Sequence, residues 1–175
     1  DVYLTQAYHD TPAGVLKEAT FSRELLAKAG RPGSIIMHNK LPFVSFEAAR
    51  AQAYLCAIEQ NGVFVWGWWD DYQMRKFAKS KKAFHERFAT LPDAKARRAA
   101  FEAEWKELTS ELSALAPAFV AAGEVQLKDV DGVVVWQKGD PAGGWLIAVN
   151  PADEEKRIVV PGLPGTIRLA PHGVL

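Results

Sequence analysis

The segment Gly62–Asp71, Gly-Val-Phe-Val-Trp-Gly-Trp-Trp-Asp-Asp, decides the predicted fold and the predicted site. Its apolar run Val63–Trp66 is continuous, which is typical of a parallel strand buried beneath covering helices. Ligands of α/β proteins collect at the carboxyl ends of such strands, so we expect a binding site where this strand ends. The residues expected there are Trp66, Trp68, Trp69, Asp70 and Asp71.

This cluster has the chemistry of a sugar site. An indole ring stacks on the C–H face of a sugar, while a carboxylate accepts hydrogen bonds from sugar hydroxyls. The alternative is structural: the indoles fill a core, and Asp70 caps the next helix.

Two strand–helix units precede this segment. Gly30 is expected to end the first helix and Ser45 to cap the second, while Thr11–Gly14 is expected to form a loop. Short connections indicate two successive right-handed βαβ crossovers and therefore a parallel sheet. The predicted order is a strand over Asp1–Ala7, a helix over Val15–Ala29, a strand over Ser34–Met37, a helix between Ser45 and Asn61, and the strand Val63–Trp66.

A long helical region follows Asp71. A basic helix is predicted over Tyr72–Phe88, where the lysines and arginines indicate a solvated face. Asp93 can cap the next helix, and Pro117 interrupts it. That helix carries an amphipathic stripe whose spacing predicts core packing, formed by Phe101, Trp105, Leu108, Leu112 and Leu115.

The periodicity changes near Gly123, where we place a boundary between residues 1–123 and residues 124–175. Short strands separated by turn residues predict an antiparallel sandwich or half-barrel, with Trp145 in its core. The predicted strands are Val125–Lys128, Val133–Lys138, Trp145–Asn150, Lys156–Val160 and Thr166–Leu169.

Composition narrows the function classes. The 175 residues are 49% hydrophobic and 24% charged, with 21 basic and 21 acidic side chains, so neither nucleic acid nor an anionic membrane is an expected partner. Cys56 is the only cysteine and is expected to be a packed, unreactive thiol. No phosphate-binding loop, dinucleotide fingerprint, zinc-type spacing or Gly-x-Ser-x-Gly motif is present, so no cofactor or metal is predicted.

The chain resembles the carboxyl-terminal third of (β/α)₈-barrel glycoside hydrolases of the large retaining clan. The resemblance lies in the helix Ala51–Ile58, the strand end Trp66-Gly67-Trp68, and the tail segments Gly144–Asn150 and Leu169–Val174. It implies an α/β fold in which the three early strands are the sixth, seventh and eighth of a barrel, followed by a small antiparallel β-sandwich. The remaining barrel segments, or another chain, would then be needed to complete the fold.

The same resemblance implies an enzyme that cleaves an oligo- or polysaccharide by carboxylate chemistry. The clan places a glutamate nucleophile after the seventh strand, whereas this chain has His38-Asn39-Lys40 there. A non-catalytic carbohydrate-binding or scaffolding protein on the same fold is therefore the alternative.

Glycoside cleavage needs two carboxyl groups, about 5 Å apart for retention or roughly 6.5–9.5 Å apart for inversion. Asp70 and Asp10 follow predicted strands and are the catalytic candidates. Residues beside them are the candidates for substrate binding, and no metal role is predicted. These substrate-binding candidates are Trp66, Trp68, Trp69, Asp71, His38, Asn39, Lys40 and His9.

Overall fold

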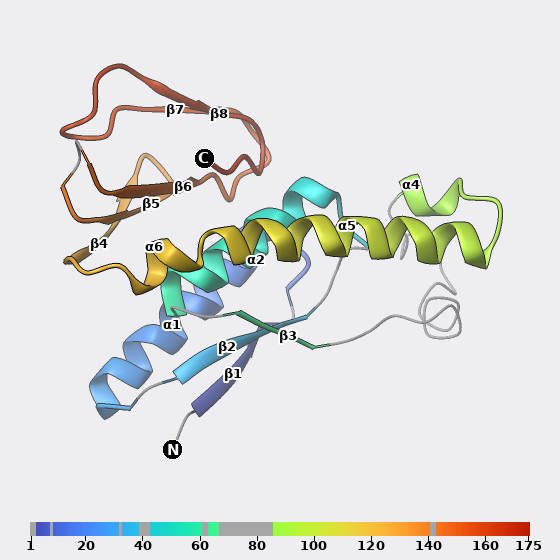
Figure 1. Cartoon of the computed structure of the whole chain (residues 1–175), viewed down its shortest axis with the longest axis horizontal. Coiled ribbons are helices and arrows are strands. Elements are labelled where there is room, and N and C mark those ends of the chain that lie inside the picture. Colours follow the sequence, from blue (N-terminus) through green and yellow to red (C-terminus); the bar gives the residue numbers. More distant parts are fainter. Residues whose placement is uncertain are drawn as a thin grey trace.

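The computed structural model describes residues 3–7, 9–31, 33–38, 43–60, 63–66, 86–140 and 143–175. Helices and strands alternate in the first half of the chain, and strands dominate the last third (Figure 1). In chain order, the elements are β1 (Tyr3–Ala7), α1 (Pro12–Ala29), β2 (Gly33–His38), α2 (Phe46–Gln60), β3 (Val63–Trp66), α4 (Glu86–Ala89), α5 (Ala94–Ala114), α6 (Ala116–Val120), β4 (Val125–Val130), β5 (Val133–Lys138), β6 (Trp145–Val149), β7 (Lys156–Ile158) and β8 (Ile167–Leu169).

The first three strands form a parallel sheet in the order β1-β2-β3. The predicted parallel pairing of the second and third strands is confirmed, with Ile35 opposite Val63 and Met37 opposite Val65. Helices α1 and α2 connect the strands and pack against each other, so both cover the same face of the sheet (Figure 1). The α/β class expected from the sequence is confirmed at this level.

Helix α1 begins earlier than the sequence pattern predicted. The expected loop over Thr11–Gly14 is wrong, because Pro12 occupies the first turn, where its missing N–H costs no hydrogen bond. Thr11 Oγ1 accepts a hydrogen bond from the Gly14 N–H at 3.2 Å and caps the helix. The predicted stop is confirmed, since Gly30 adopts a left-handed φ of 60° at the C-cap.

Helix α2 is buried on nearly every side. The predicted cap is confirmed, with Ser45 Oγ accepting from the Ala48 N–H at 3.1 Å. Every residue from Ala51 to Glu59 is buried, the polar Gln52 and Glu59 included. Helix α1, the parallel sheet, α5 and β6 all contact this helix. Its alanines allow these neighbours to approach closely.

Helix α5 packs through the predicted stripe. Asp93 Oδ1 caps it by accepting from the Ala96 N–H at 2.8 Å. Phe101 and Leu108 are buried, and Trp105 and Leu112 pack against the same clusters. The predicted interruption is also confirmed, because α5 ends before Leu115 and a proline opens α6. Of the predicted basic helix, residues 72–85 lie outside the described part of the chain.

The five strands predicted after Gly123 are all present. Strands β4, β5 and β6 form an antiparallel sheet, and β7 pairs with β8 in a second one. Alternate residues of β5 face opposite sides. Val134 and Trp136 pack in a cluster with α2 and α6, whereas Val133 and Val135 pack against β7 and β8. The first sheet is thus covered on both faces.

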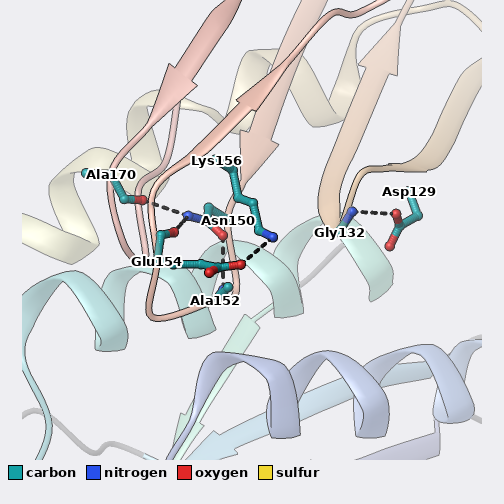
Figure 2. Close-up of polar contacts among 7 residues, drawn as sticks. All are labelled: Asp129, Gly132, Asn150, Ala152, Glu154, Lys156 and Ala170. Carbon is teal, nitrogen blue, oxygen red and sulfur yellow. Dashed lines mark hydrogen bonds and ion pairs between the residues drawn. The ribbon is translucent and has the colours of Figure 1, made fainter.

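The side chain of Asn150 fixes the backbone that follows β6 through hydrogen bonds. It is fully buried, and its amide nitrogen donates to the carbonyl oxygens of Glu154 and Ala170 at 2.7 and 2.8 Å (Figure 2). Its side-chain oxygen accepts from the Ala152 N–H at 3.0 Å. One buried amide therefore satisfies three backbone groups and fixes the segment that leads to β7.

The expectation that Trp145 lies in the core is wrong. Trp145 is 41% exposed, whereas Trp136 is fully buried and packs against the Phe119 ring at a centroid distance of 5.4 Å. The difference follows from position in the sheet. Trp136 lies in the central strand β5, but Trp145 is the first residue of the neighbouring strand β6, opposite Lys138.

The close packing of α2 leads to a stability prediction. Ala53 is fully buried between α1 and α5, so Ala53→Leu adds three carbons to a filled core and should lower the free energy of unfolding by about 1–3 kcal/mol. Urea denaturation measures the change. Ala103→Leu makes the same substitution at an exposed position of α5 and should be nearly neutral. Equal effects of the two substitutions would contradict close packing around α2.

Candidate functional site

The carboxyl ends of the three parallel strands lie level at one edge of the sheet. Ala7 at the end of β1 is opposite Met37 of β2, which is opposite Val65 of β3. One residue further, the Cα atoms of His38 and Trp66 are cross-strand partners. The strand register therefore brings two predicted site residues from different strands side by side.

Six of the predicted site residues follow these strand ends but lie outside the described part of the chain: Asn39, Lys40, Trp68, Trp69, Asp70 and Asp71. His38 and Trp66 are described as the last residues of β2 and β3. His9 and Asp10 follow β1, and both are exposed. The structure thus describes the three strand ends that precede the predicted site residues, but not most of those residues.

Three neighbours hold His9 between β1 and α1. Its Nε2 lies 3.6 Å from Glu18 Oε2 across the first turns of α1. Its backbone carbonyl oxygen lies 3.5 Å from the amide nitrogen of buried Gln52, which donates to it. Gly14 leaves no room behind the ring, because a Cβ there would lie 2.8 Å from the His9 Cβ. The position of His9 is therefore set jointly by α1 and α2.

A group of charges that the sequence did not reveal joins α4 to α5. Arg87 Nη2 lies 2.7 Å from Glu104 Oε2, and the pair is 17 residues apart in sequence. Burial raises the pKa of Glu104, although Arg87 opposes this. The negative charge of Glu47 also raises the pKa of Glu104. Glu47 lies in the first turn of α2, which follows β2 in the sequence. A half-buried carboxyl group with a raised pKa is a recurring feature of functional sites and of structural ion pairs.

A second group of polar side chains locks α2 to α5 and to the end of the chain. Arg50 Nε donates to both carboxylate oxygens of Glu111 at 2.9 and 2.8 Å, and its Nη1 donates to the Val174 carbonyl oxygen at 3.3 Å. These hydrogen bonds lower the pKa of Glu111. Burial, and then Glu111, raise the pKa of Tyr54 to about 12. All four groups are held by partners within the fold, so we assign this cluster a structural role.

The remaining candidate chemistry is limited. Cys56 is fully buried, and burial raises the pKa of its thiol to about 12, which disfavours the reactive thiolate. Within the described residues, no group of three or more acidic, histidine or cysteine side chains has the arrangement of a metal site. None of the described helices is both long and apolar enough to cross a membrane.

No family model matches the chain, and no match to a curated protein or to a solved structure reaches significance. Function is therefore inferred from the strand ends at one edge of the parallel sheet and from the sequence that follows them.

The contact between Gly14 and His9 can be tested. Replacing a helical glycine with alanine stabilises a helix by up to about 1 kcal/mol through propensity alone. Here the new methyl group would collide with His9, so Gly14→Ala should instead lower the free energy of unfolding and shift the His9 ring resonances in NMR spectra. Gly143→Ala is the control, because its Cβ would meet nothing within 4 Å. A stabilised Gly14→Ala protein with unchanged His9 resonances would contradict this placement.

Proposed function

We propose that the protein is a carbohydrate-active barrel, a glycoside hydrolase or a segment of one, with its sugar site at the carboxyl ends of β1, β2 and β3. The observation that carries the proposal is the level register of these strand ends, which juxtaposes His38 and Trp66. The sequence continues from Trp66 directly into Trp68, Trp69 and Asp70. A sequence rich in indoles and carboxylates directly after a parallel strand matches the needs of a sugar ligand.

The strand order supports a (β/α)₈ barrel over a doubly wound sheet. In a doubly wound sheet the order reverses, and helices cover both faces. Here the order runs β1-β2-β3 without reversal, and α1 and α2 lie together on one face. Successive right-handed crossovers that advance in one direction are how a barrel is built.

The outer flank of α1 gives a second argument. Thr20 and Arg23 contact Glu59 of α2 on one flank of this helix. Phe21 and Leu25 lie on the opposite flank by helical spacing and are 60% and 51% exposed. In a closed barrel each helix has a neighbour on both flanks, and a helix beside α1 would bury these two side chains.

The β-sandwich part of the proposal is supported by the apolar cluster shared between the β4-β5-β6 sheet and β7-β8.

The second candidate function is carbohydrate binding without catalysis. It is favoured by the residues after β2, where His38-Asn39-Lys40 supplies no carboxylate. Asp70 and Asp10 then distinguish the two functions, because cleavage requires a pair of carboxyl groups and binding does not.

Steady-state kinetics on oligosaccharides tests the proposal in the full-length natural protein. Trp68→Ala and Trp69→Ala should raise KM, because an indole contributes contact area to the bound sugar. Asp70→Asn should lower kcat by at least about a hundredfold if its carboxylate transfers a proton.

Asp131→Asn is the matched control, since Asp131 is an exposed turn residue of the antiparallel part and should leave both constants unchanged. If the variants at Trp68, Trp69 and Asp70 are folded and have the same KM and kcat as the unsubstituted protein, the proposed site is wrong. If the unsubstituted protein binds oligosaccharides without cleaving them, and the Trp68 and Trp69 variants lose that affinity, the function is carbohydrate binding without catalysis.

A further inference from the structure

His9 lies at the carboxyl edge of the parallel sheet, where β1 ends. It follows Ala7, the last residue of β1, by two positions, and its side chain is 45% exposed. An accessible ring at the carboxyl end of a parallel strand is placed where α/β proteins bind their ligands. The contacts of this ring therefore bear on what the sheet edge can bind.

The backbone of His9 is held from the protein interior. Gln52 of α2 is 1% exposed, and its side-chain amide nitrogen donates to the His9 carbonyl oxygen at 3.5 Å. Burying an amide is costly unless it is hydrogen-bonded, so this contact ties the segment after β1 to the core. His9 thus combines a fixed backbone with an accessible side chain, as a preorganised binding group requires.

Gly14 keeps side-chain atoms away from one nitrogen of the His9 ring. A Cβ at Gly14 would lie 2.8 Å from the His9 Cβ and 3.0 Å from its Nδ1, so any other residue would crowd that nitrogen. Glycine is a weak helix former, yet it occupies the first turn of α1. The glycine therefore lets the ring lie against α1 with Nδ1 uncovered.

Glu18 acts on the other ring nitrogen. Its Oε2 lies 3.6 Å from His9 Nε2, a distance that a small movement of the 38% exposed Glu18 side chain closes to a hydrogen bond. A neutral imidazole has one donor and one acceptor nitrogen, and a carboxylate beside one of them holds the proton there. The proton is then on Nε2 and the lone pair on Nδ1, the nitrogen that Gly14 leaves uncovered.

This arrangement suits a hydroxyl group as the ligand. The lone pair of Nδ1 accepts a hydrogen bond from an O–H group, whereas an ionised phosphate or carboxylate has no proton to donate to it. The negative charge of Glu18 also repels an anionic group beside the ring. A neutral sugar, with hydroxyl groups around its ring, meets both conditions.

We propose that His9 binds a hydroxyl group of a neutral sugar through Nδ1, and that Glu18 is the positioning residue that holds the ring proton on Nε2. The inference deepens the proposed function and rests on it, because the sugar site at the sheet edge supplies the choice of ligand. It assigns a subsite to the end of β1 and restricts the substrate class to neutral sugars.

NMR spectra of the histidine rings in the isotope-labelled full-length protein test the role of Glu18, at about pH 8, where an ordinary imidazole is neutral. The His9 ring should be in the Nε2–H form in the unsubstituted protein and should populate both tautomers in Glu18→Leu. Glu18→Gln keeps an acceptor oxygen and should restore the single form. The chain has four histidines, and His9→Phe identifies the His9 signals by their absence. Glu24→Leu, at an exposed position of the same helix, is the control.

Titration calorimetry with maltohexaose, cellohexaose, xylohexaose and chitohexaose tests the contact with sugar. His9→Phe keeps an aromatic ring against Gly14 but has no ring nitrogen, so it should weaken binding of at least one hexasaccharide by about tenfold. Glu18→Leu should weaken binding of the same sugar, and Glu18→Gln should restore most of the affinity. Glu24→Leu should bind as the unsubstituted protein does.

Three results would each overturn the proposal. The first is a His9 ring that keeps the same single tautomer in Glu18→Leu. The second is a His9→Phe protein that binds every hexasaccharide as Glu24→Leu does. The third is an unsubstituted protein that binds none of the four hexasaccharides.

Failure of this inference is distinguishable from failure of the proposed function. A raised KM in Trp68→Ala, with normal binding by His9→Phe, would remove the His9 subsite and keep the sugar site after β3. Weakened binding by His9→Phe, with unchanged kinetics in the variants at Trp68, Trp69 and Asp70, would keep the His9 subsite and remove the site after β3.

Discussion

The burial of every residue from Ala51 to Glu59 in α2 is the constraint on which the rest of the structure depends. Ala51, Ala53 and Leu55 are fully buried, and the polar residues Gln52 and Glu59 are buried with them. Burying a carboxylate is costly unless it is paired. Here Glu59 lies 2.7 Å from Arg23 Nε and accepts a second hydrogen bond from Thr20 at 3.2 Å. The helix can therefore be enclosed only when α1 is in place beside it.

The same helix joins the two parts of the chain. On one side it covers the parallel sheet, and on another side its Tyr54 and Ile58 pack in a cluster with Trp136 of β5. Arg50 adds a polar link to the last residues through the Val174 carbonyl oxygen. The antiparallel part is thus not attached by a linker alone, because it supplies one wall of the core around α2. The parallel sheet and the antiparallel part consequently belong to one packed unit.

The local features of the fold could be predicted because the residues that cause them are adjacent in sequence. Ser45, Asp93 and Gly30 cap helices through groups four or fewer residues away, so each cap can be recognised in the sequence. The parallel order of three strands followed from the lengths of the connections. The burial of the whole stretch from Ala51 to Glu59 could not be predicted, since an apolar pattern identifies a helix face but not the number of neighbours. The start of α1 was missed because Pro12 is compatible with both a loop and a first helical turn.

Some features of the candidate site can likewise be predicted from the sequence, and others cannot. A parallel sheet brings strand ends together, so the proximity of His38 to Trp66 was predictable from strand order. The pairing of Arg87 with Glu104 depends on how α4 folds back on α5, which no local pattern encodes. Likewise, the exposure of Trp145 and the burial of Trp136 depend on which strand of the sheet is central.

The most direct test of this account is native-state hydrogen exchange measured by NMR at low denaturant concentrations. If α2 is the shared core, the amides of residues 51–58 in α2 and those of β5 and β6 should exchange with the same, highest free energy of opening, equal to that of global unfolding. Exchange of the β5 and β6 amides through a separate, lower-energy opening, while α2 stays protected, would contradict the claim that one helix holds both parts of the chain together.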